Sequence, residues 1–231
     1  FNNPNQLGYF SVCVMSFAYI FYQLDKINYL ELFVVASLSV LLSILSLSNA
    51  AMVPNFLIYF FVIIPKDKRL VYDYWIGIIF FILVICFYQF FLNGLEQFKF
   101  FHRISSMFSQ HDASLAVRGY FAFLDAPPYA WVSGLGVRQV VDIVGHEVHS
   151  TIFGVLNNYG LVGLLLISIV FGDWSYRIWR AFGLNGLICI AAGPMLYGLT
   201  HNGIRSSLFW VLFAVSIAAA STINENKNCQ H

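Results

Sequence analysis

The sequence predicts an all-α, polytopic membrane protein of about seven transmembrane helices with one long extramembrane loop. Of its 231 residues, 59% are hydrophobic and only 10% are charged, whereas soluble domains are about 45–50% apolar and about 25% charged. The apolar residues gather in long stretches that lack the strict alternation of membrane β-barrel strands. An ordinary soluble globular protein is therefore excluded.

Seven stretches are apolar enough to span a bilayer, which takes a helix of about 20 residues because no backbone group can stay unpaired in lipid. They are 6–24, 30–48, 50–65, 70–93, 151–171, 183–200 and 206–223. The third is short and contains Pro54, and the sixth contains Pro194, which membrane helices tolerate when neighbours satisfy the freed carbonyl. We expect four spans in 1–93, a loop at 94–150, and three spans with a tail in 151–231.

Charge and cysteine content exclude several other classes. Twelve Lys and Arg face eleven Asp and Glu, for a net charge of +1, so the chain has no strong basic field to attract nucleic acid. Its four cysteines form no CxxC pair and no disulfide framework. The opening FNNPNQLG begins without Met and lacks the features of a signal peptide, so we expect a fragment of a longer protein.

The cations in the short connections predict the orientation, because Lys and Arg concentrate on the cytoplasmic side. One side of the predicted bundle carries Lys26, Lys66, Lys68, Arg69, Arg177, Arg180 and Lys227. The other carries Arg205 and the cations of the loop. The loop is therefore expected outside, together with the FNNPN opening, the Ser48-Asn49 turn and the turn at 200–203.

The 94–150 loop is the expected place of any chemistry. It holds nine of the charged residues and four of the six histidines, and connections this long are more often functional than idle. The run Gly145-His146-Glu147-Val148-His149-Ser150 is its densest group of ionisable side chains. A zinc-protease helix needs H-E-x-x-H, whereas here the histidines are three residues apart, so no metal site is expected. His149 at the mouth of a span can act as a base, although two polar residues closing a loop explain the run equally simply.

Two further features of this half of the chain suggest a site. Gly160 and Gly163 share one helix stripe that would let another helix approach closely, whereas Asn157 and Asn158 are amides inside a span, where polar groups usually face a cavity or a partner helix. Arg118 lies in a stretch with a helical apolar period, typical of a helix on the membrane surface. Its planar guanidinium suits phosphate oxygens, although a lone arginine can also be a solvated charge or a headgroup contact.

In their order along the chain, these motifs resemble the C-terminal half of the bacterial O-antigen ligase and polymerase superfamily. The matching motifs are Asn3-Pro4-Asn5, Ser48-Asn49, Asp112 to Arg118, Gly134-Leu135-Gly136, and His149 through Gly163. They cover nearly the whole chain, although each is short.

The resemblance implies an inverting glycan transferase of the bacterial inner membrane that needs no metal or other cofactor. Such enzymes take a glycan from undecaprenyl diphosphate at the periplasmic face and join it to an acceptor hydroxyl, on lipid A core or on a growing glycan. By motif, Arg118 would bind the diphosphate and His149 would be the general base or position the acceptor. The other candidates for substrate binding are Arg103, Arg138, Asn49, His146, Glu147 and Asn157.

One departure leaves alternatives open. Asn49 stands where family members often have Arg, which removes one expected diphosphate cation, and Arg103, Arg138 or Arg205 are possible substitutes. A polymerase that joins carrier-linked repeats is the first alternative to a ligase. The second is a transporter or flippase without chemistry, but such proteins usually carry ionisable groups within their spans, and here the charges gather at one face.

Overall fold

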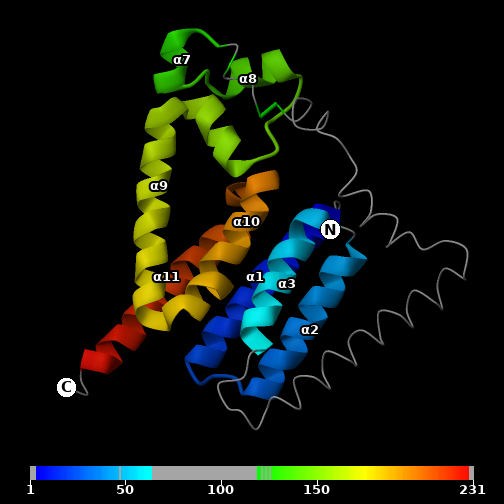
Figure 1. Cartoon of the computed structure of the whole chain (residues 1–231), viewed down its shortest axis with the longest axis vertical. Coiled ribbons are helices and arrows are strands. Elements are labelled where there is room, and N and C mark those ends of the chain that lie inside the picture. The colour runs from blue at the N-terminus through cyan, green and yellow to red at the C-terminus, as the bar shows by residue number, and fades with distance from the viewer. Residues whose placement is uncertain are drawn as a thin grey trace, which may run out of the picture. The chain divides into compact units, whose positions relative to one another are not determined.

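The computed structural model describes residues 4–46, 48–63, 119–120, 122, 124 and 126–228. Within these residues every regular element is a helix, which confirms the predicted all-helical class. The elements are α1 (Pro4–Gln23), α2 (Tyr29–Leu45), α3 (Asn49–Ile63), α7 (Pro128–Ser133), α8 (Val137–Val144), α9 (Thr151–Gly186), the π-helix η2 (Leu187–Ala192), α10 (Gly193–Thr200), the 3₁₀-helix η3 (Gly203–Arg205) and α11 (Ser207–Asn228) (Figure 1). Apart from Ile63 they belong to one compact unit. The predicted span 70–93 and the loop up to Arg118 lie outside the described residues.

Helix α1 is the element that ties this unit together, because it contacts α2, η2, α10 and α11. Small residues allow the close approach. The fully buried Ser16 hydroxyl donates a hydrogen bond of 2.7 Å to the Cys189 carbonyl in η2, and a Cβ at Gly193 would overlap the Ile58 side chain. Close contacts through small residues and interhelical hydrogen bonds are typical of helices that pack in lipid.

Helices α2 and α3 have well-defined local determinants. Asn28 caps α2 by accepting a hydrogen bond from the Glu31 amide, and the Glu31 carboxylate accepts one from the Asn28 amide, which is a complete capping box. In α3, Pro54 lies inside the helix. The buried Asn55 beside it donates a hydrogen bond of 2.8 Å to Ser11 of α1.

The 36-residue helix α9 is bent twice, at Gly160 and at Gly183, where φ is 65° and 71°. Its uninterrupted part therefore runs over 161–182, about 33 Å at about 1.5 Å per residue. This is close to the thickness of a hydrocarbon core, about 30 Å. The predicted span 151–171 runs across the bend at Gly160, because the helical pattern of the sequence continues unchanged through this glycine.

Among the described residues, two helical segments are long and apolar enough to cross a membrane: Thr151–Thr200, which runs from α9 through α10, and Ser207–Glu225 of α11. The most apolar stretch of each is only 22% and 28% buried. On α9 the exposed large residues form a nearly continuous apolar surface of Leu161, Val162, Leu165, Leu166, Ile169 and Val170. Contiguous apolar surfaces of this kind are rare on soluble monomers.

A buried cluster around Trp174, which follows the exposed apolar residues of α9 in the sequence, holds α9 to α11. The Trp174 indole N–H donates a hydrogen bond of 2.8 Å to Ser216 on α11. The Trp174 ring meets Phe209 edge to face at a centroid distance of 5.7 Å. All three side chains are at most 2% exposed, so this cluster fixes the spacing of the two helices.

Candidate functional site

The bend of α9 at Gly160 joins the helix to the chain that follows α7. Because Gly160 is not helical, the carbonyls of Asn157 and Asn158 lose their acceptor role within the helix. They accept instead from the amides of Leu135 and Gly136, at 2.8 and 3.0 Å. A Cβ at Gly160 would overlap the Val132 carbonyl. The predicted close approach at Gly160 thus occurs, but its partner is the end of α7 and not another long helix.

Asn157, a predicted substrate-binding residue, is fully buried. Its side-chain amide donates a hydrogen bond of 3.1 Å to the carbonyl of Gly119, the residue that follows Arg118 in the sequence. Its side-chain oxygen has no hydrogen-bond partner among the described residues. Asn157 therefore links α9 to the 119–120 segment.

Tyr120 connects three segments of the site. Its hydroxyl lies 3.4 Å from the His149 carbonyl and 3.3 Å from the Thr200 carbonyl. Its ring stacks on Phe153 of α9 with centroids 4.8 Å apart. With only 4% of its surface exposed, Tyr120 holds His149 against the end of α10.

The predicted residues His146, Glu147 and His149 lie together, and Arg205 joins them; we call these four the polar cluster. The two imidazole rings stack with centroids 5.3 Å apart. Glu147 forms an ion pair with Arg205 of η3, and both side chains are about half exposed. Polar groups on the loop and on the 200–206 turn are thus brought together across more than fifty positions of sequence.

Hydrogen bonds connect the start of α9 to the 200–203 turn, next to the polar cluster. Ser150 caps α9 by accepting from the Phe153 amide at 3.4 Å. The Thr151 hydroxyl donates to the His201 carbonyl at 3.4 Å and accepts from the Gly203 amide at 3.1 Å. These bonds fix the position of His149 relative to η3.

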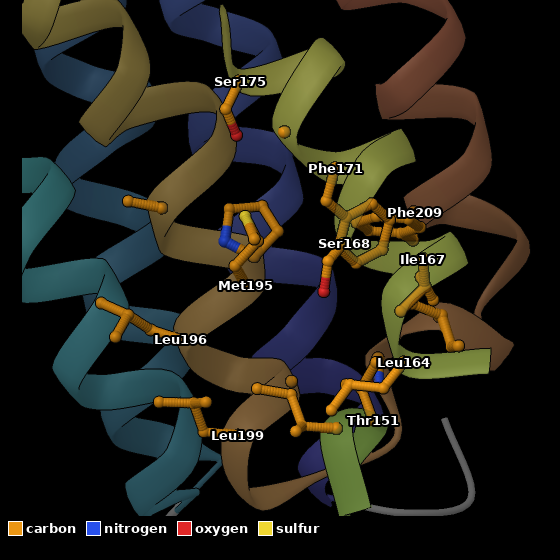
Figure 2. Close-up of a pocket in the computed structure, with 17 residues that line it drawn as sticks. Thr151, Leu164, Ile167, Ser168, Phe171, Ser175, Met195, Leu196, Leu199 and Phe209 are labelled. Atoms are coloured by element: carbon orange, nitrogen blue, oxygen red, sulfur yellow. The ribbon is translucent and has the colours of Figure 1, made fainter. Parts of the chain in front are cut away.

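An apolar groove of about 520 Å³ runs between α9, α10 and the start of α11 (Figure 2). Leu164, Ile167, Ser168 and Phe171 line it from α9, and Met195, Leu196 and Leu199 line it from α10. Thr151 and Gly203 border the same groove. The groove therefore begins two residues along the chain from His149 and Arg205 and continues along the apolar part of α9.

A second, more polar cavity of about 430 Å³ lies between α1, α10 and η3. Its lining includes Gln6, Tyr9, Tyr197, Asn202 and Arg205, and Gly203 borders both this cavity and the apolar groove. The rings of Tyr9 and Tyr197 are 4.4 Å apart. This cavity brings the start of α1 to the same end of the unit as the polar cluster.

Four predicted residues remain. Arg138 is exposed on α8, and Asn49 is the first residue of α3. Arg103 and Arg118 lie outside the described residues. The sequence analysis did not predict Tyr120 as a site residue, although an aromatic residue next to the Arg118 motif is a signal of a buried contact. Arg205 was predicted only as a substitute cation for the diphosphate.

Within the described ranges, no three His, Cys, Asp or Glu side chains are grouped so that they could hold a metal ion. Comparisons of the chain with protein-family models, with curated proteins and with solved structures find no match.

Proposed function

We propose that this chain belongs to an integral membrane protein in which residues 161–182 of α9 cross the bilayer, together with α11. The apolar side chains that α9 exposes support this assignment, because lipid and not water is the solvent that such a surface favours. The other predicted spans and a periplasmic position of the 94–150 loop complete the proposed topology, in a bacterial inner membrane.

We further propose that the protein transfers a glycan from undecaprenyl diphosphate to an acceptor hydroxyl, as the sequence resemblance implies. The observation that carries this proposal is that the apolar groove is bordered by Thr151 and Gly203, which lie two residues along the chain from His149 and Arg205 of the polar cluster. A polyprenyl diphosphate has the same two parts, a flexible apolar chain and a strongly polar head. The groove suits the chain, and the head would then lie beside His149 and Arg205.

In the proposed reaction the acceptor oxygen attacks the anomeric carbon of the carrier-linked sugar. The bond between that carbon and the diphosphate oxygen breaks, and undecaprenyl diphosphate leaves with the electron pair. His149, in its neutral form, takes the proton of the acceptor hydroxyl. Arg118 neutralises the charge that develops on the diphosphate, and the hydrogen bond from Asn157 to Gly119 holds the segment that follows it.

The test is a cell that lacks the full-length protein and is complemented with single variants. His149→Ala and Arg118→Ala should each abolish joined surface glycan while the protein still inserts in the membrane. Gln139→Ala, at an exposed position of α8, is the matched control and should restore the glycan. Normal glycan in both His149→Ala and Arg118→Ala cells would refute the proposal.

The same cells separate the two acceptor classes. Carrier-linked glycan that accumulates with many chain lengths indicates that the missing step is ligation to lipid A core. Carrier-linked glycan limited to one repeat indicates that the missing step is polymerisation.

A further inference from the structure

Helix α7 exposes an unusual number of large apolar and aromatic side chains for an element of six residues. Tyr129 is 64% exposed, Trp131 41% and Val132 56%. The helix, Pro128-Tyr-Ala-Trp-Val-Ser133, carries no charge. Only Ala130 is buried, so most of the helix is presented to whatever surrounds the protein.

The position of α7 relative to α9 is fixed by backbone contacts. Leu135 and Gly136, which follow α7, donate to the carbonyls of Asn157 and Asn158. A Cβ at Gly134 would overlap the backbone of Asn158 and Tyr159. Helix α7 therefore lies at the bend where the straight part of α9 begins (Figure 1).

Aromatic residues mark both ends of that straight part. Tyr159, 55% exposed, stands at the α7 end, and Tyr176 and Trp179, each 52% exposed, stand at the other. Leu161 and Tyr176 are about 23 Å apart along the helix axis at about 1.5 Å per residue. The exposed large hydrophobic residues between them are all aliphatic. Tyrosine and tryptophan concentrate at the two interfaces of a bilayer whose hydrocarbon core is about 30 Å thick.

Charge follows the same division. Arg180 lies over the Tyr176 ring at 5.9 Å, and Arg177 pairs with Asp173 at 2.7 Å, so the Tyr176 end carries basic side chains of the kind that favours the cytoplasmic side. At the α7 end, neither α7 nor the first ten residues of α9 contain Lys or Arg.

We propose that α7 lies in the headgroup layer of the bilayer, with Tyr129 and Trp131 in contact with lipid, and that it sets with Tyr176 and Trp179 the depth at which α9 crosses. The chain after α7 is hydrogen-bonded to Asn157 and Asn158. The contact of α7 with lipid therefore also holds the polar cluster at the membrane surface. The inference rests on the proposed membrane crossing of α9 and is independent of the proposed glycan transfer.

The test uses the full-length protein in phosphatidylcholine vesicles that contain lipids brominated either near the headgroup or near the end of the acyl chain. The difference in fluorescence between the unchanged protein and Trp131→Phe is the contribution of Trp131 alone. We expect that component to be quenched more strongly by the shallow bromines than by the deep ones and to resist acrylamide in the water. Tyr129→Trp in the Trp131→Phe background should restore the shallow quenching.

Trp179→Phe provides the control, since Trp179 reports the other end of the same helix. If only acrylamide quenches Trp131, α7 lies in water. If neither brominated lipid nor acrylamide quenches Trp131, protein covers it. Either result overturns the proposal. If bromolipids quench Trp179 but not Trp131, only the α7 proposal fails. If they quench neither, the membrane crossing of α9 fails with it.

Discussion

Helix α1 buries polar side chains among its apolar ones, whereas the straight part of α9 exposes apolar side chains. On α1, polar residues lie inside: Ser11 and Ser16 are fully buried and hydrogen-bonded between helices. On α9, Leu165, Leu166 and Ile169 point outward and are about 60% exposed. In water this arrangement would leave the apolar face of α9 unfavourably exposed. In lipid it is expected, since helices associate there through small and polar contacts and have no hydrophobic driving force toward one another.

The joint between α7 and α9 gives the largest expected effect. Gly134→Ala places a Cβ against the backbone of Asn158 at φ +80°. A conformation that is nearly restricted to glycine costs about 1–3 kcal/mol, and overpacking about 1–3 kcal/mol more. We expect the free energy of unfolding in detergent to fall by about 4 kcal/mol.

Gly172→Ala is the matched control, because a Cβ there meets no atom within 4 Å. It should be neutral or stabilise α9 by about 1 kcal/mol, the helix preference of Ala over Gly. Equal destabilisation by both substitutions would contradict the described joint.

A charge on the outward face of α9 gives the next effect. Leu165→Arg puts a guanidinium where Leu165 is 62% exposed. If that face contacts lipid, membrane insertion of the protein should become less favourable by about 3 kcal/mol. Val137→Arg on α8, at a position 49% exposed, should insert normally. Normal insertion of the Leu165→Arg protein would show that α9 does not contact lipid, and the contrast with α1 would lose its explanation.

The buried hydroxyl of Ser16 tests the other half of the comparison. Ser16→Ala removes the 2.7 Å hydrogen bond to Cys189 and should lower the free energy of unfolding by about 0.6–1.7 kcal/mol, the range of interhelical hydrogen bonds in membranes. Ser221→Ala is its control, because that exposed hydroxyl bonds only within α11. A difference between the two variants near zero would mean that the α1 contact adds no stability.

The ion pair between Glu147 and Arg205 is expected to contribute least. Both side chains are about half exposed, and pairs of this kind contribute about 0–1 kcal/mol. A double-mutant cycle of Glu147→Gln and Arg205→Gln should therefore give a coupling free energy below about 1 kcal/mol. A much larger coupling would show that the pair holds the loop to η3, a role we assign to Tyr120 and Thr151.

Sequence patterns were sufficient for the helical class and for the proximity of His146, Glu147 and His149, because these features depend on composition and on neighbouring positions. They were insufficient for the bend at Gly160. A glycine is compatible with a helix, and only the approach of Val132 and Gly134 from elsewhere in the chain forces the change in φ. The patterns were also insufficient for the partner of Asn157, because the Gly119 carbonyl is a backbone group that no side-chain motif reports.

The pairing of the polar cluster with the apolar groove also depends on long-range contacts. Tyr120 and Thr151 bring the 200–203 turn to the start of α9 through backbone carbonyls and amides. Such bonds leave no spacing signature in the sequence. The groove itself lies between α9 and α10, and the apolar composition of both helices does not determine how they are placed relative to one another.

Transfer by the full-length protein reconstituted in vesicles tests the central claim most directly. With undecaprenyl diphosphate-linked glycan and an acceptor glycan, the unchanged protein should release one undecaprenyl diphosphate for each glycan joined. His149→Ala should insert equally well and join glycan about 10²–10⁴-fold more slowly, the loss typical of a missing general base. Transfer by His149→Ala at the rate of the unchanged protein, or the absence of transfer by the unchanged protein with either acceptor, would contradict the account.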